Sequence, residues 1–224
     1  LTFDDGPSSL TPTVLDLLDQ YNAKATFFVL GTNADNFPET VKREYDLGME
    51  VGTHTTSHSQ LTKMSGSTLD KEVSDSVKSI EKADGVRPSL MRPPYGAYND
   101  EVLAVAKSYD LCCVNWSLDT EDWKTKNADD TYRMVMTATD GDVILLHDIH
   151  QYNVEAVERF IPDLIDAGFQ LVTVPELYEA RGETLKPGTI HFRTDPTTEK
   201  SEETTEAAYN EEDDELLNDQ DVEE

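Results

Sequence analysis

Short apolar runs alternate with segments of helical periodicity along most of this 224-residue chain. In one such segment Leu69, Val73 and Val77 recur every four residues, which places them on one face of a helix. Alternation of strand and helix indicates a parallel sheet built from βα units, and about seven strands are close to the number that closes a barrel. We therefore expect an α/β fold, a distorted (β/α) barrel with about seven parallel strands. The expected strands cover residues 1–3, 24–30, 49–53, 89–91, 111–116, 142–146 and 170–174.

The C-terminal end of the chain has a different composition. From Asp195 onward there are 14 acidic residues against one basic residue, Lys200, and few large apolar side chains. Such a segment buries too little apolar surface to offset the entropy lost on folding. We expect one folded domain over residues 1–193 and a disordered acidic tail over residues 194–224. The sequence begins at Leu1 inside an expected strand, so we also expect a truncated N-terminus.

The formal net charge of -28 excludes several classes of partner. Such a surface repels phosphate backbones and anionic headgroups, so we expect no nucleic acid and no acidic lipid as partners. No stretch approaches the roughly 20 apolar residues that span a bilayer, so we expect no membrane insertion of this segment. A neutral substrate fits this surface better.

Two histidines and an acidic pair are the strongest chemical signal. His54 and His58 can bind one ion if the segment between them forms a single helical turn. Asp4 and Asp5 stand at the end of the first expected strand, before the turn-forming Gly6-Pro7. Adjacent carboxylates repel each other, so a cation between them would explain the pair. Two histidines and one carboxylate leave an ion such as zinc with an open position, as a hydrolytic site requires.

Further polar side chains follow other expected strands. Arg92 and Tyr95 come after the fourth strand, Asp119 and Asp122 after the fifth, and His147 after the sixth. In barrels of βα units the carboxyl ends of the strands meet at one face, where the active site lies. We expect these side chains to converge there with the histidines and the acidic pair.

These residues belong to five short motifs that occur in order along the chain. The motifs are Thr2-Phe3-Asp4-Asp5-Gly6, residues 54–58, Arg92-Pro93-Pro94-Tyr95, residues 119–123 and Leu145-Leu146-His147. They resemble the five motifs of the polysaccharide deacetylases, the NodB-homology family or carbohydrate esterase family 4. Similarity continues to about Leu177, so the resemblance covers most of the chain except the tail.

The resemblance implies a role for each residue of the first two motifs. It implies that Asp5, His54 and His58 bind a divalent metal ion, with Zn²⁺ expected and Co²⁺ able to substitute. It also implies that Asp4 is the catalytic base. The residues by themselves do not distinguish the roles of the two aspartates.

The later motifs are similar to the family's remaining catalytic and substrate-binding groups. Arg92 would pair with Asp4, and the backbone N–H of Tyr95 would stabilise the oxyanion. Core packing is the alternative role for Tyr95. The expected substrate-binding residues are Trp123, Leu145 and Pro93, and Trp123 and Leu145 could instead belong to the core.

His147 resembles the family's catalytic acid, which gives a proton to the departing amine. A carboxylate that orients its ring would also favour the protonated form. Asp119 and Asp122 both fit this position, and we prefer Asp122 because it directly precedes Trp123. His150 is a further histidine near the expected mouth, and we assign it no role.

The expected function is hydrolytic removal of N-acetyl groups from N-acetylglucosamine units of a polysaccharide. Peptidoglycan is favoured because Val114-Asn115-Trp116-Ser117 and Leu146-His147-Asp148 resemble bacterial cell-wall deacetylases. A chitin or chito-oligosaccharide deacetylase and an acetylxylan esterase are the alternatives within the family. The family also implies an extracellular or cell-envelope location, and we expect a monomer.

Two functions of other classes remain as rivals. A carbohydrate-binding homologue without turnover would not need the complete set of catalytic side chains. A metallopeptidase usually carries a glutamate within its histidine motif, where this chain has Thr55, Thr56 and Ser57.

Overall fold

The computed structural model describes residues 1–195, and nearly all of the expected acidic tail lies outside these residues. Eight strands form one sheet in the order β6-β7-β1-β2-β3-β4-β5-β8. Every neighbouring pair is parallel. The strands are β1 (Thr2–Asp4), β2 (Thr26–Val29), β3 (Glu50–Thr53), β4 (Leu90–Met91), β5 (Cys112–Val114), β6 (Leu118–Asp119), β7 (Ile144–His147) and β8 (Ile190–His191).

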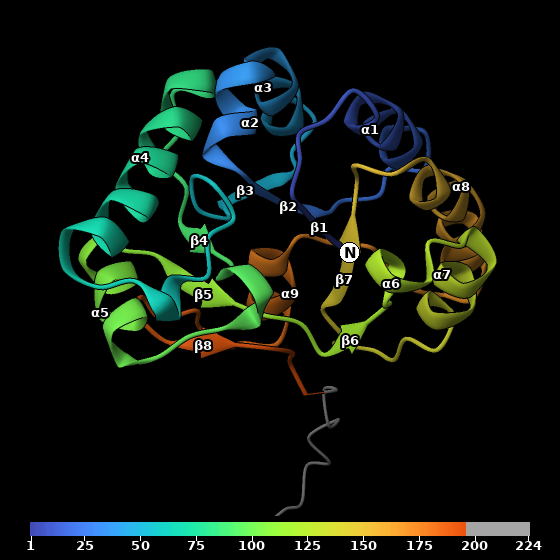
Figure 1. Ribbon diagram of the computed structural model, residues 1–224. Coiled ribbons are helices and arrows are strands. Elements are labelled where there is room, and N and C mark those ends of the chain that lie inside the picture. Colours follow the sequence, from blue (N-terminus) through green and yellow to red (C-terminus); the bar gives the residue numbers. More distant parts are fainter. Residues whose placement is uncertain (196–224) are drawn as a thin grey trace, which may run out of the picture.

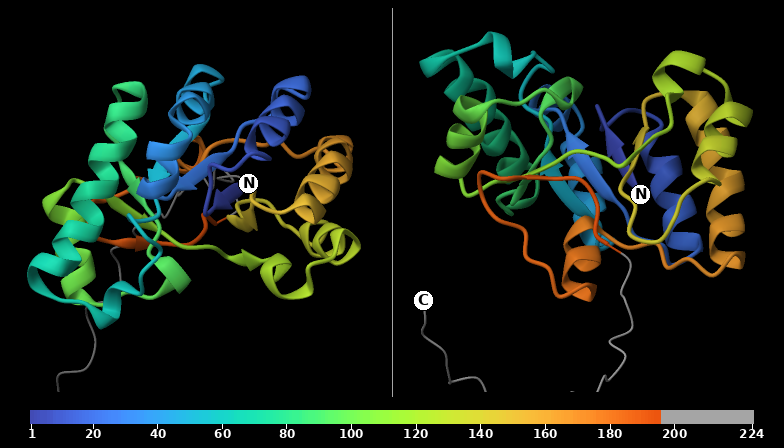
Figure 2. Two further views of the ribbon diagram at one scale, coloured as in Figure 1. Left: turned by 45° about the horizontal axis from the view of Figure 1, so that its top comes forward. Right: turned by 90° about the horizontal axis from the view of Figure 1, so that it is seen from below.

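Helices surround the curled sheet, as Figure 1 shows. Two short 3₁₀ segments, η1 (Leu61–Lys63) and η2 (Pro94–Gly96), lie in loops. The α-helices are α1 (Thr11–Gln20), α2 (Gly31–Asn36), α3 (Pro38–Asp46), α4 (Gly66–Asp84), α5 (Asp100–Ser108), α6 (Asp122–Thr125), α7 (Ala128–Val135), α8 (Gln151–Asp166) and α9 (Val174–Ala180). Helices α4, α3, α1 and α8 contact one another in that order along the outer side of the sheet (Figure 2). The expected α/β architecture of parallel strands is confirmed, as a half-barrel that no pairing between β6 and β8 closes within residues 1–195.

The strand count differs from the expectation at three places. The expected strand over residues 170–174 is wrong, because Thr173 caps α9 through reciprocal hydrogen bonds with Glu176 and the preceding residues form a loop. Strands β6 and β8 were not expected, since each has only two residues and shows no readable periodicity. Strand β8 also lies beyond Glu179, where the apolar pattern of the sequence stops.

Apolar side chains are buried between the sheet and its helices. Phe3 of β1 stacks on Phe27 of β2 with ring centroids 5.1 Å apart. The repeat of Leu69, Val73 and Val77 lies on the buried face of α4, as its spacing predicts. This packing fixes the strands, and therefore the loops that follow their carboxyl ends.

The sheet register brings distant polar residues to one edge. Asp4 at the end of β1 lies opposite His147 at the end of β7. Thr53 at the end of β3 lies opposite Met91 at the end of β4, so His54 and Arg92 leave the sheet side by side. Parallel pairing therefore places four separate motifs at the same edge.

Thr194 belongs to the folded part of the chain. Thr194 is buried, and its N–H donates to the carbonyl of Gly141 at 3.1 Å. The first residue of the segment expected as a tail therefore packs against the folded domain.

No helix within residues 1–195 has the length and apolar character that a membrane span requires.

The contact between α2 and α4 leaves no room for a side chain at Gly31. A Cβ atom there would lie 2.8 Å from the backbone Cα of Ser76 in α4. We predict that Gly31→Ala forces α2 away from α4 and lowers the free energy of unfolding by about 1–3 kcal/mol, the usual cost of overpacking. Thr32→Ala, at the exposed neighbouring position, should change it by less than about 0.5 kcal/mol. Urea denaturation of both variants measures this, and equal stabilities would contradict the prediction.

Candidate active site

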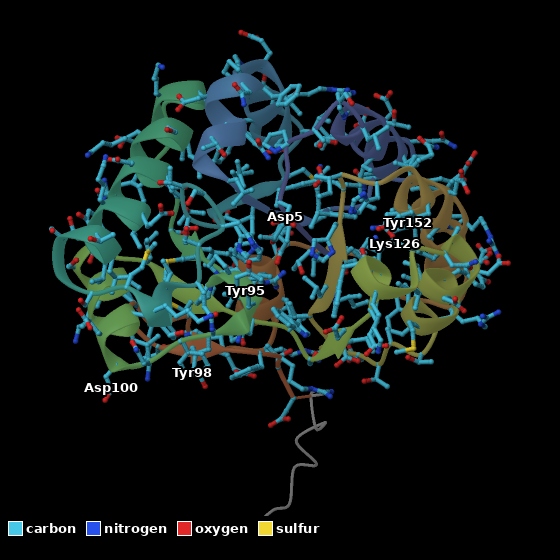
Figure 3. All side chains as sticks on the ribbon, in the orientation of Figure 1. Asp5, Tyr95, Tyr98, Asp100, Lys126 and Tyr152 are labelled. Carbon is cyan, nitrogen blue, oxygen red and sulfur yellow. The ribbon has the colours of Figure 1, made fainter. Side chains whose placement is uncertain are left out.

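A cavity of about 420 Å³ opens at the carboxyl edge of the sheet. It is lined by Asp4, Asp5, His54, His58, Tyr95, Trp116, Asp119, Trp123, Leu145 and His147. Figure 3 places Asp5 and Tyr95 near the centre of this mouth. Arg92 and Asp122 are fully buried behind the lining, each in contact with a residue that faces the cavity. Pro93 is buried and is not one of the lining residues.

Asp5, His54 and His58 have the geometry of a metal site. The Nε2 atoms of His54 and His58 lie 3.6 and 3.5 Å from Oδ1 of Asp5. Ligands about 2.1 Å from a tetrahedral ion lie about 3.4 Å apart, which matches these separations. Asp5 Oδ1 is buried and has no hydrogen-bond partner among residues 1–195. A buried acceptor without a donor, facing two imidazole nitrogens, fits a divalent cation.

His54 is held in the form that can bind a metal. Its Nδ1 lies 2.7 Å from the carbonyl oxygen of Arg92, which can only accept, so Nδ1 carries the proton. Burial lowers the pKa of His54 to about 3, against the opposing charge of Asp5. The ring is therefore neutral, and its Nε2 lone pair faces Asp5.

The loop between the two histidines differs from the expectation. The helical turn on which a shared ion was made conditional does not form, because Thr55 and His58 have φ angles of 70° and 59° in the left-handed region. Asp5 and Tyr95 share this conformation, with φ of 70° and 62°. Left-handed non-glycine residues are strained and concentrate at functional sites. At Asp5 the strain is offset by Asn33, whose Nδ2 donates to the Asp5 carbonyl at 2.8 Å.

Asp4 and Arg92 form the buried ion pair that the family resemblance implies. Arg92 Nη1 donates to Asp4 Oδ1 at 2.7 Å and to Thr2 Oγ1 at 2.8 Å. Its Nε and Nη2 donate to the carbonyls of Val114 and Asn115, each at 2.9 Å. Burial raises the pKa of Asp4, and the charge of Arg92 opposes that rise. The other oxygen, Asp4 Oδ2, faces the metal ligands, 3.7 Å from Nε2 of the nearer histidine.

His147 is held by Asp122. Their Nδ1 and Oδ1 atoms lie 2.8 Å apart, and Asp122 Oδ2 accepts from the His147 N–H at 2.9 Å. Burial alone lowers the pKa of His147, but the hydrogen bond to Asp122 and the nearby carboxylates outweigh it and raise this pKa to about 9. Asp119 Oδ1 instead accepts from the Glu121 N–H at 2.9 Å. Asp122, and not Asp119, therefore forms the hydrogen bonds with His147.

Two residues near the site were not predicted from the sequence. Asn153 of α8 donates to both Asp122 Oδ2 and the carbonyl of His147, the latter at 2.7 Å. Trp116 lines the cavity directly. A loop tryptophan before the fourth motif is a signal that sequence reasoning could have used, whereas Asn153 carries none. His150 stacks on Tyr152 at 4.9 Å and is not among the lining residues.

Two exposed aromatic side chains stand at the mouth of the cavity. Tyr95 is 64% and Trp123 is 52% exposed, so core packing, the alternative role considered for both, is wrong. The Tyr95 ring meets the His58 ring edge-on at 4.6 Å. Leu145 is buried but contributes to the cavity wall.

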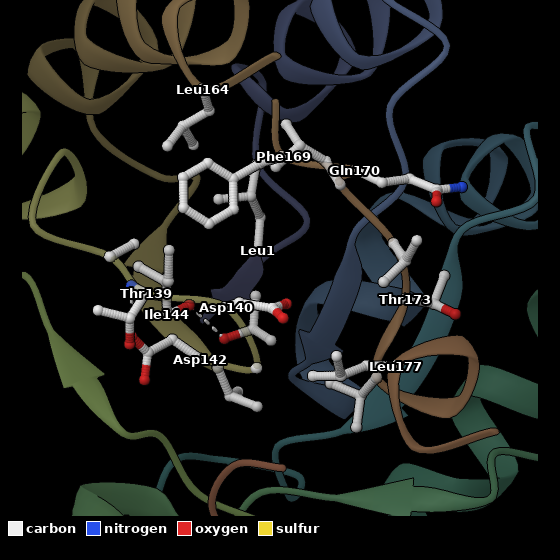
Figure 4. Close-up of a pocket in the computed structure, with 17 residues that line it drawn as sticks. Leu1, Thr139, Asp140, Asp142, Ile144, Leu164, Phe169, Gln170, Thr173 and Leu177 are labelled. Atoms are coloured by element: carbon white, nitrogen blue, oxygen red, sulfur yellow. Dashed lines mark hydrogen bonds between the residues drawn. The ribbon is translucent and has the colours of Figure 1, made fainter. Parts of the chain in front are cut away.

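A separate cavity, of about 70 Å³, lies at the opposite edge of the sheet, beside the first residues of β1 and β7 (Figure 4). Leu1, Leu164, Phe169 and Ile144 contribute to its wall, and no histidine lines it. Of these two cavities, the candidate catalytic side chains therefore converge on the larger one.

Comparison with known proteins agrees with this geometry. Residues 1–114 match the family described as polysaccharide deacetylase. This chain belongs to the polysaccharide deacetylase family. The peptidoglycan-N-acetylglucosamine deacetylase PgdA of Listeria monocytogenes is 44% identical over 194 residues, which cover 86% of this chain and 40% of that protein.

Two further deacetylase-family relatives have solved structures. The peptidoglycan-N-acetylmuramic acid deacetylase PdaC of Bacillus subtilis is 44% identical over 81% of this chain and 38% of that protein. Its structure gives a TM-score of 0.78 and covers 81% of this chain and 89% of the solved chain. The structure of an acetyl xylan esterase of Clostridium thermocellum in complex with a cobalt ion gives a TM-score of 0.79 at 34% identity. The match covers 85% of this chain and 95% of that chain. This chain thus spans about 40% of the length of the two curated relatives named here.

The contact between His147 and Asp122 predicts a measurable titration. We predict that Asp122→Asn lowers the pKa of His147 clearly below about 9, because the variant removes the carboxylate that favours the protonated ring. Asp119→Asn, which changes an acid in the same cavity without a bond to His147, should leave that pKa near its original value. NMR titration of the imidazole signals in metal-free protein measures both. An equal fall in the two variants would show that general cavity charge, and not this hydrogen bond, sets the pKa.

Proposed function

We propose that this domain is a metal-dependent de-N-acetylase that acts on N-acetylglucosamine units of a polysaccharide, with peptidoglycan as the polymer. One observation carries the proposal. The three metal-binding side chains lie between a buried carboxylate paired with an arginine and an imidazole paired with a second carboxylate. This arrangement supplies a base and an acid on two sides of one ion.

Asp5, His54 and His58 would hold the ion. Their one oxygen and two nitrogen donors suit Zn²⁺, and we propose Zn²⁺ as the ion with Co²⁺ as a substitute. When bound, such an ion polarises the acetyl carbonyl and lowers the pKa of water. The cobalt ion in the related acetyl xylan esterase supports a divalent metal in this family.

Asp4 is proposed as the base. Its Oδ1 is held by Arg92, while Oδ2 faces the metal ligands and is free to take a proton from water. Burial raises the pKa of Asp4, and the positive charge of Arg92 opposes that rise and so favours the carboxylate form. Arg92 therefore acts through Asp4 and does not itself touch the substrate.

His147 is proposed as the acid. Asp122 fixes Nδ1, and Nε2 lies 3.9 Å from Asp5 Oδ2, so the proton on Nε2 faces the place where the acetamide would bind. That proton passes to the nitrogen as the C–N bond breaks. The N–H of Tyr95 would donate to the oxyanion, with Trp123 and Leu145 against the sugar and the acetyl methyl group.

The choice of substrate rests on the relatives and on the cavity. The two bacterial relatives are named for N-acetylglucosamine and N-acetylmuramic acid deacetylation. Among the residues lining the cavity there is no lysine or arginine that could pair with the lactyl carboxylate of muramic acid. This favours the neutral N-acetylglucosamine unit. We propose a monomer that works in the cell envelope.

Two measurements test the function. We predict that chelation abolishes acetate release and that added Zn²⁺ or Co²⁺ restores it. A panel of peptidoglycan, chito-oligosaccharides and acetylxylan, assayed for acetate, should show the highest kcat/KM on peptidoglycan. Acetate only from acetylxylan would favour the esterase, and full activity of the metal-free enzyme would refute the proposal. Cleavage of casein would instead indicate a peptidase.

The neighbouring aspartates provide a sharper test of the assigned roles. We predict that Asp4→Asn keeps bound metal near wild-type stoichiometry while turnover falls by about 10²-fold or more, the usual scale for loss of a general base. Asp5→Asn should weaken metal binding, because a neutral amide replaces a charged ligand. Excess Zn²⁺ should then partly restore Asp5→Asn and leave Asp4→Asn unchanged. Metal content and rate across a zinc titration measure both effects, and the reverse pattern would exchange the two roles.

A further inference from the structure

The loop that carries His54 and His58 needs support that its own backbone does not supply. Thr55 and His58 are both left-handed, so the four-residue spacing is not maintained by helical hydrogen bonds. The His58 side chain is 28% exposed, whereas that of His54 is 3% exposed and tied to the Arg92 carbonyl. The position of His58 therefore depends on the contacts that hold Thr56 and Ser57, the two residues before it.

Glu72 of helix α4 contacts these residues with both its backbone and its side chain. Its carbonyl accepts from the N–H of Thr56 at 3.0 Å and from Thr56 Oγ1 at 2.8 Å. Its carboxylate accepts from the N–H of Ser57 at 3.1 Å and from Ser57 Oγ at 2.9 Å. All four donors belong to the two residues that directly precede His58.

Helix α4 is a firm base for these contacts. Leu69 and Val73, on either side of Glu72 along the helix, are fully buried in the core. Helix α2 holds the same loop from another direction, because the Gly31 N–H donates to the Thr55 carbonyl at 2.9 Å. Glu72 belongs to no ion pair within residues 1–195. Its carboxylate instead contacts Ser57 of the loop.

We propose that Glu72 is a positioning residue of the metal site. Its carboxylate and carbonyl fix Thr56 and Ser57 so that the Nε2 atom of His58 meets the oxygen of Asp5. The inference rests on the metal site proposed above. Groups that hydrogen-bond directly to metal ligands contribute about 10–100-fold to metal affinity in other metalloproteins, and we take this range for Glu72, which acts through the two residues before His58.

Zinc affinity measured on metal-free protein tests the proposal without relying on turnover. Competition between the protein and a chromophoric chelator gives the dissociation constant. We expect Glu72→Ala to raise it by about 10–100-fold. Glu72→Gln retains one carbonyl acceptor and should raise it less. Glu81→Gln, on the same helix beside Arg87, is the matched control and should leave it unchanged.

Two further readouts separate positioning from general stability. At saturating zinc, Glu72→Ala should recover wild-type kcat and KM, whereas a disturbed fold would not recover. Ser57→Ala removes the donor to Glu72 Oε1. The double variant with Glu72→Gln should therefore weaken zinc binding by less than the two single effects combined. These two conservative variants keep the test valid if Glu72→Ala fails to fold.

The outcomes distinguish this inference from the function on which it rests. Wild-type protein that binds no zinc would overturn the metal site and the role of Glu72 together. Wild-type affinity in folded Glu72→Ala would overturn only the role of Glu72, and the metal site would stand. Additive effects of Ser57→Ala and Glu72→Gln would also contradict it.

Discussion

The buried ion pair between Arg92 and Asp4 is the interaction on which the rest of the site depends. A fully buried guanidinium is costly unless it is paired and hydrogen-bonded, and here each of its three nitrogens donates, with a carboxylate, a hydroxyl and two carbonyl oxygens as acceptors. These partners lie on β1 and at the end of β5, while Arg92 itself follows β4. Its carbonyl in turn accepts from His54. One residue therefore joins three strands and orients both the proposed base and a proposed metal ligand.

The two buried histidines show how environment separates chemical roles. Burial lowers the pKa of His54 to about 3, which leaves a neutral ring that can bind a cation. His147 is also largely buried, yet its hydrogen bond to Asp122 raises its pKa to about 9. The difference lies in the partner of Nδ1, which is a neutral carbonyl for one ring and a carboxylate for the other. The proposed metal ligand and the proposed acid are thus the same type of side chain in two different environments of one cavity.

Backbone strain gathers around the same cavity. Asp5, His58 and Tyr95 all have left-handed φ angles although none is glycine. Each of the three lines the cavity, and strain of this kind persists only where surrounding contacts hold it. Asn33 holds Asp5 from α2, and Glu72 holds the residues before His58 from α4. Helices outside the sheet therefore support the precise geometry of a site that loops carry.

The sequence by itself determined the parallel α/β fold, the family and the residues that meet at the strand ends, because strand alternation and five ordered motifs are local patterns. It preferred Asp122 over Asp119 without deciding between them, made a shared ion for His54 and His58 conditional on a helical turn that does not form, and carried no sign of Asn153. Only the tertiary structure decided these points. The Asp122 contact spans 25 residues and the Glu72 contact with Ser57 spans 15, so both depend on how helices and strands pack, which no local spacing records.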